Sequence, residues 1–144
     1  MMMKKYINLS FIYAVAAMIG GVFYREFTKL TGFTGKTTLS VVHTHLFLLG
    51  MIFFLLVLLL ENSFSISKQK LAKPFLVFYN LGLCLTVIML IIRGVAQVLQ
   101  TPLSGGANGA ISGFAGIGHI MIGIGMILLL LMVRNALPTA KPQA

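Results

Sequence analysis

The sequence has few charged residues, one cysteine and no tryptophan. Only 9% of its 144 residues are charged, and the two acidic ones, Glu26 and Glu61, lie far apart. Neither can form a paired-carboxylate catalytic site, and no Ser/His/Asp arrangement or phosphate-binding glycine loop occurs. The single Cys84 excludes an intrachain disulfide and any CxxC site, and the absence of C-x-x-C-H excludes covalent c-type heme. Hydrolytic and nucleotide-driven activities therefore have no support.

Hydrophobic residues make up 58% of the chain, more than a soluble domain of this length needs. Four apolar runs reach the roughly 20 residues of a membrane-spanning helix. They cover about residues 6–24, 39–60, 74–100 (the longest) and 110–133. The first also fits a cleavable signal peptide, but we interpret it as a transmembrane helix. The short connections predict an all-α, up-down-up-down four-helix bundle, a single transmembrane domain of residues 1–144 with a flexible tail at 135–144.

Basic residues are unevenly divided between the two sides of the predicted bundle. One side has Lys4, Lys5, Lys68, Lys70, Lys73, Arg134 and Lys141, and the other has Arg25, Lys29 and Lys36. This bias predicts that both termini are cytoplasmic, in a bacterial cytoplasmic membrane. Because the basic residues flank the apolar runs, the net charge of +9 indicates contact with lipid headgroups and not with nucleic acid.

All three histidines lie within apolar runs. His43 and His45 occur in V-V-H-T-H-L-F-L-L-G, and His119 occurs in G-I-G-H-I-M-I-G. An ionisable side chain inside a membrane costs free energy unless a partner holds it, so such residues are functional candidates. At about 1.5 Å rise per residue, the three imidazoles and Arg93 fall within roughly two turns of one level, near the outer leaflet.

Two imidazoles on different helices at one depth can bind both faces of a heme iron. We therefore predict a non-covalent heme b. His43 shares a helix face with Gly50, whereas His45 points about 200° away from that face. We therefore expect His43 to lie opposite His119. If this helix is rotated, His45 is the ligand instead. The other heme-binding candidates are Arg93 and Arg25 for the propionates, Tyr24 and Gln97 as hydrogen-bond donors, and Gly50, Gly116 and Gly123 as room for the macrocycle.

Several alternatives stay open at this point. The imidazoles could bind a copper or zinc ion, or simply be hydrogen-bonded within the protein. Heme binding would serve electron transfer, with a quinone or a redox protein as partner, or heme handling, or heme-based sensing. A cofactor-free transporter or channel, with a path lined by Tyr, Gln, Arg and His, is the main rival, and an accessory subunit of a respiratory complex is another. GxxxG-like spacings near His119 favour helix packing, within the chain or in a homo-oligomer.

Four segments carry a resemblance to known proteins. They are G-V-F-Y-R-E-F-T-K, V-V-H-T-H-L-F-L-L-G-M-I-F-F, F-Y-N-L-G-L and G-I-G-H. Together they resemble a functionally unassigned family of small four-helix membrane proteins of Gram-positive bacteria, which implies the four-span topology. The V-H-T-H-L segment alone resembles the helix that binds low-spin heme in heme–copper oxidases and nitric oxide reductases. That resemblance implies an axial-ligand role for His43 or His45, but this chain has four spans where those enzymes have twelve, and it lacks the adjacent histidine pair of their second metal centre.

Overall fold

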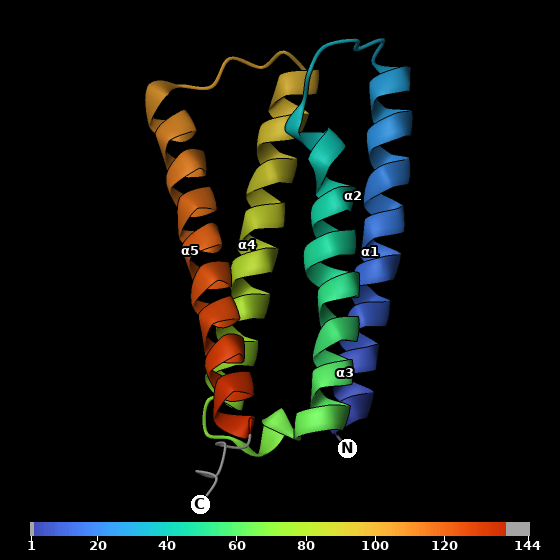
Figure 1. The fold of residues 1–144 in the computed structure, drawn as a ribbon. Coiled ribbons are helices and arrows are strands. Elements are labelled where there is room, and N and C mark those ends of the chain that lie inside the picture. The colour runs from blue at the N-terminus through green and yellow to red at the C-terminus, as the bar shows by residue number, and fades with distance from the viewer. Residues whose placement is uncertain (1, 138–144) are drawn as a thin grey trace, which may run out of the picture.

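The computed structural model describes residues 2–137, which form four antiparallel helical spans (Figure 1). Each is long and apolar enough to cross a bilayer, so the predicted all-α four-helix membrane bundle is confirmed. The second span, Thr38–Phe64, is one continuous helix that consists of four segments of different helix type. Its segments are η1 (Thr38–Val41), α2 (Val42–His45), η2 (Leu46–Ile52) and α3 (Phe53–Phe64). The first span is α1 (Met2–Leu30), the third is α4 (Ala72–Val98) and the fourth is α5 (Gly105–Ala136). A short 3-10 helix, η3 (Ile66–Lys68), lies between α3 and α4.

The helices extend beyond most of the apolar runs that predicted them. Lysine, arginine and glutamate are good helix formers, so α1 continues through charged residues at both of its ends. The longest helix is α5, with 32 residues, and not the predicted third span, whose helix α4 has 27. Ser104 starts α5 by accepting a hydrogen bond from the backbone N–H of Ala107 at 3.2 Å. Because α5 continues to Ala136, it includes the start of the predicted tail, of which residues 138–144 lie outside the described part.

The bundle consists of two closely packed helix pairs. In one pair α1 lies along the second span, and in the other α4 lies along α5, with α4 and the second span in the middle of the view in Figure 1. Glycine permits the close approach of α4 and α5. A Cβ atom at Gly82 would lie 2.7 Å from the backbone nitrogen of Ile122, and one at Gly125 would lie 2.8 Å from the Cβ of Tyr79.

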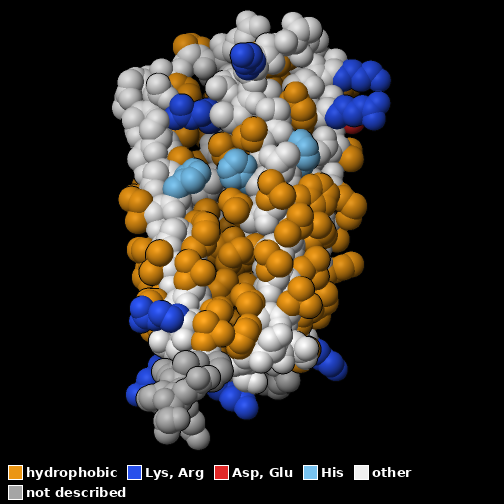
Figure 2. Space-filling view, viewed as in Figure 1, with side chains coloured by type: hydrophobic (Ala, Val, Ile, Leu, Met, Phe, Trp, Pro, Cys, Tyr) orange, Lys and Arg blue, Asp and Glu red, His pale blue; other side chains and the backbone are white. Residues whose placement is uncertain are grey.

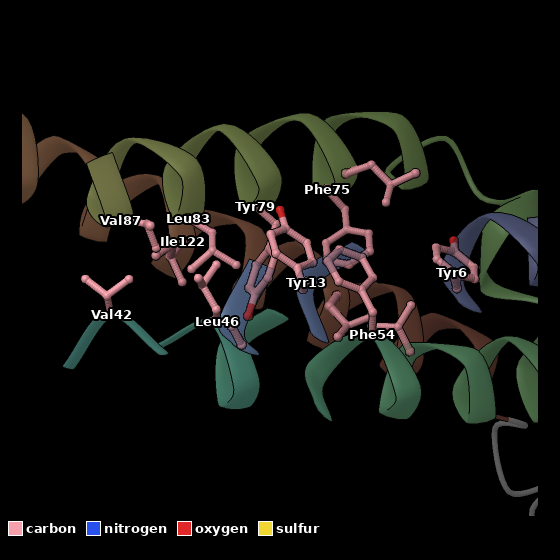
Figure 3. Packing of buried hydrophobic residues seen from close by; sticks show 14 of the residues in the cluster. Tyr6, Tyr13, Val42, Leu46, Phe54, Phe75, Tyr79, Leu83, Val87 and Ile122 are labelled. Carbon is pink, nitrogen blue, oxygen red and sulfur yellow. The ribbon is translucent and has the colours of Figure 1, made fainter. Parts of the chain in front are cut away.

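Aromatic and aliphatic side chains together fill the core between the two pairs, with an aromatic cluster at its centre (Figure 3). The ring of Tyr13 on α1 stacks on Phe54 with centroids 5.8 Å apart, and the ring of Tyr79 on α4 stacks on Phe53 with centroids 3.9 Å apart. Tyr79 also meets Phe54 edge-on, so one cluster joins α1, α3 and α4. This rigid centre fixes how the second span is rotated against its neighbours.

A π-helix, η2, interrupts the second span directly after His45. A π turn disturbs the regular α-helical bonding of the carbonyls, and in a membrane each polar group needs a partner. The hydroxyl of Tyr79 donates to the carbonyl of Leu49 at 2.8 Å, and that of Ser10 donates to the carbonyl of Met51 at 2.9 Å. Side chains of both neighbouring helices thus stabilise the widened turn.

The two ends of the bundle differ in charge. Met2 and Ala136 lie at the same end, which we call the lysine-rich end (Figure 1). This end carries Lys4, Lys5, Lys68, Lys70, Lys73 and Arg134. Its acidic residue, Glu61, accepts hydrogen bonds from the backbone N–H and the hydroxyl of Ser67 and so orders the loop before α4. That this end faces the cytoplasm stays a prediction.

Candidate cofactor site

The histidine side chains lie at one level, near the upper edge of the apolar band (Figure 2). Two of them meet across the gap between the second span and α5. The rings of His45 and His119 have centroids 6.4 Å apart and planes at 90°. The half-buried His45 lies on α2 and the exposed His119 on α5, so two separate helices supply the pair.

Both imidazoles are bonded to their own helices in the same way. The Nδ1 atom of His45 lies 2.8 Å from the carbonyl oxygen of Val41, and that of His119 lies 2.8 Å from the carbonyl oxygen of Ala115. A carbonyl oxygen can only accept, so Nδ1 is the donor in each ring, and in a neutral imidazole Nε2 then keeps its lone pair. An imidazole held by one nitrogen and free at the other is the usual arrangement of a metal ligand.

His43 lies on the opposite side of the second span and faces α1. A Cβ atom at Gly21 would lie 3.6 Å from the Cβ of His43, and the Nδ1 of His43 is buried with no partner within the described residues. The expectation that His43 lies opposite His119 is therefore corrected, because His45 takes this place. The predicted face shared by His43 and Gly50 exists, but it packs on α1 and not on α5.

Gly50 has a packing role and leaves no room for a macrocycle. A Cβ atom there would lie 2.5 Å from the Cβ of Tyr13, so the glycine lets α1 approach the π-helix. Gly116 and Gly123 are different, since a Cβ atom at either would meet nothing within 4 Å. They lie three residues before and four residues after His119, so they flank it on the open surface of α5.

Arg93 on α4 is hydrogen-bonded to the face of α5 that carries His119. Its Nη2 donates to the Ser112 hydroxyl at 2.7 Å and to the Asn108 carbonyl at 3.4 Å. Ser112 is seven residues before His119, which puts it on nearly the same face and about 10 Å farther from the lysine-rich end. Arg93, Gln97 and Asn108 line a polar groove of about 360 Å³ there.

The remaining candidates are not brought to the histidine pair. The Gln97 side-chain oxygen accepts from the backbone N–H of Thr38 at 2.8 Å, so this residue ties α4 to the start of the second span. Arg25 lies on α1 with its side chain 81% exposed, 3.7 Å from Glu26. Tyr24 is half-buried on the same helix. Since α1 packs on the His43 side of the second span, neither residue is a partner of His45 and His119.

The sequence did not predict two features near the histidine pair, an apolar groove at His45 and the role of Asn108. A groove of about 230 Å³ is lined by Thr44, His45, Leu48 and Leu49, and is mostly apolar. Asn108 was missed as a partner of Arg93, although its spacing of four residues from Ser112 could have indicated it. Within residues 2–137 no group of three or more His, Cys, Asp or Glu side chains could hold a metal ion.

Comparison with known proteins places the chain by family alone. No curated protein and no solved structure matches it. A family match covers residues 3–136, and so includes all four spans, His45, His119 and Arg93. The chain belongs to the family described as "Protein of unknown function (DUF2871)", and it is a multi-pass membrane protein of that family.

Proposed function

We propose that this membrane protein binds one heme b non-covalently, with His45 and His119 as the axial ligands. The observation that carries the proposal is their pairing, with ring centroids 6.4 Å apart and each Nδ1 bonded to its own helix, which leaves Nε2 without a hydrogen bond to residues 2–137. A metal ion between two imidazole nitrogens, at about 2.0–2.1 Å from each, would separate the ring centroids by roughly 6 Å. The observed centroid separation of 6.4 Å is close to this value.

The residues around the pair suit a flat, apolar cofactor with an acidic edge. Gly116 and Gly123 leave open surface beside His119, and Leu48 and Leu49 offer apolar contacts beside His45. Arg93 lies on the side away from the lysine-rich end, where its guanidinium can pair with a propionate. Arg93 would thus hold the acidic edge of the cofactor on this side of the histidine pair.

Electron transfer is the role that these ligands favour. A heme iron with two imidazole ligands supplies one-electron redox chemistry and has no open coordination position. All three histidines lie at one level, toward the end of the bundle opposite the lysine-rich end (Figure 2). The electron would therefore be exchanged near that opposite end, with a quinone or a redox protein. His45 and His119 would hold the ring, and Arg93 would position it.

A copper ion is the second candidate for the same pair. It is favoured by the direct approach of the two rings and by the absence, within residues 2–137, of any cluster with a third ligand. Imidazole is a suitable ligand for copper. Zinc is less well supported, since structural zinc sites have four protein ligands and catalytic ones have three.

The test is an absorption spectrum of the detergent-purified protein, oxidised and then reduced with dithionite, together with metal analysis. We expect a Soret band and a sharp reduced α-band, both lost in His119→Ala. A colourless protein with one copper per chain would replace heme by the second candidate. A colourless, metal-free protein from heme-supplied cells would refute both and favour the transporter, channel or accessory-subunit alternatives.

A further inference from the structure

A separate groove of about 460 Å³ lies between α1 and α4. Leu9 and Ile12 on α1 and Leu76 on α4 form its walls, with Lys5 at the lysine-rich end and Tyr13 at the far end. Lys5 and Tyr13 are eight residues apart, so the groove runs about 12 Å along the bundle. Its rim includes large exposed apolar side chains, among them Ile12 with 59% exposure. The groove therefore opens toward the hydrocarbon of a bilayer.

Tyr13 and Asn80, two polar residues of the groove away from its lysine end, are already paired. The Tyr13 hydroxyl donates to the Asn80 side-chain oxygen at 2.7 Å, and the Asn80 side-chain nitrogen donates to the Leu76 carbonyl at 2.8 Å. A ligand with a neutral hydrogen-bonding head, such as a quinone, would find few open partners there. The groove walls are therefore best suited to binding an apolar chain.

No acidic side chain within residues 2–137 forms an ion pair with the lysine at the end of the groove. Within residues 2–137 the one ion pair joins Arg25 to Glu26, on α1 near the other end of the bundle. Glu61, the acid of the lysine-rich end, is bonded to Ser67. Lys5 is exposed and adds to the basic residues around it, so an anion at the membrane surface is its natural partner.

We infer that the α1–α4 groove binds an anionic phospholipid, with one acyl chain along Leu9, Ile12 and Leu76 and the phosphate at Lys5. A phospholipid meets both requirements at once, because its charge lies at the depth where the lysines end the span and its chain enters the hydrocarbon beside them. This inference is independent of the heme proposal, since it uses none of the same residues.

The experiment uses the full-length protein in phosphatidylcholine vesicles that carry a trace of lipid with a photoreactive acyl chain. Cross-links are mapped by mass spectrometry with phosphatidylglycerol or phosphatidylcholine as the photoreactive lipid. We expect phosphatidylglycerol to label the groove walls about fivefold more, as one lysine at an anionic headgroup should give. Lys5→Gln should remove this preference, and the matched control Lys4→Gln, next to it but not lining the groove, should keep it.

Three results would overturn the inference. The first is equal labelling by the two lipids, and the second is an equal effect of Lys4→Gln and Lys5→Gln, which would indicate general surface charge. The third is displacement of the photoreactive phosphatidylglycerol by excess quinone. Val77→Trp, at a 53% exposed position of the groove wall, checks the location without disturbing the core. It should lower labelling by both lipids; unchanged labelling would be a fourth result against the inference, because the acyl chain would then bind elsewhere.

Discussion

At the scale of the residue, the backbone bonds of two histidines carry most of the functional argument. Each Nδ1 binds the carbonyl one turn earlier, which fixes the ring and directs Nε2 away from its own helix. His119 is nevertheless exposed on an apolar helix, where an imidazole facing lipid is unfavourable. A cofactor between His119 and His45 would remove this cost.

A glycine substitution tests the packing of α4 on α5. Gly82→Ala would place a methyl group 2.7 Å from the Ile122 nitrogen and 2.8 Å from the Gly118 carbonyl oxygen, both of them backbone atoms. We expect a loss of about 1–3 kcal/mol of stability, measured by thermal unfolding in detergent.

Gly113→Ala on α5 is the matched control, because its methyl group would meet nothing within 4 Å. Alanine is the better helix former by about 1 kcal/mol, so this variant should be neutral or more stable. Equal destabilisation by the two variants would contradict the described packing.

At the scale of the element, the π-helix in the second span is bonded to side chains of two neighbouring helices. Its widened turn lies between His45 and Phe53, and Tyr79 and Ser10 donate to two of its carbonyls. Gly50, within the turn, lets Tyr13 pack directly on it. The turn is thus held by contacts with both α1 and α4, next to the candidate ligand His45.

Removing one of these donors tests the role of the turn. Tyr79→Phe would remove the hydrogen bond to the Leu49 carbonyl, and we expect a loss of about 1 kcal/mol of stability. Hydrogen exchange of the peptide covering residues 46–52 should become faster. Tyr24→Phe, at a half-buried position on α1, should change neither quantity. An unchanged exchange rate in Tyr79→Phe would show that this hydrogen bond does not stabilise the turn.

The sequence was sufficient to predict the four spans, because their apolar runs exceed what a soluble helix carries. It was also sufficient to place His43 and Gly50 on one face, since helical periodicity is local. It could not show that this face packs on α1, because the choice of neighbour depends on tertiary contacts such as that of Gly50 with Tyr13. Nor did any residue pattern indicate the π-helix, whose partners Ser10 and Tyr79 come from other spans.

At the scale of the whole molecule, the charge difference between the ends predicts how the protein is oriented. The lysine-rich end carries Lys4, Lys5, Lys68, Lys70, Lys73 and Arg134, and Arg25, Lys29 and Lys36 lie toward the other end. Positively charged loops are retained in the cytoplasm. Green fluorescent protein fused after residue 144 should therefore fluoresce, and alkaline phosphatase fused there should be inactive. Active phosphatase would reverse the orientation and put the histidine pair near the cytoplasmic surface.

The central claim is that His45 and His119 hold one heme between the second span and α5. Its most direct test is the heme content per chain of three variants purified in parallel, His43→Ala, His45→Ala and His119→Ala. Because only His45 and His119 lie together, we predict that their two variants lose heme and that His43→Ala keeps it. Loss of heme from His43→Ala with full retention in His45→Ala would contradict the account.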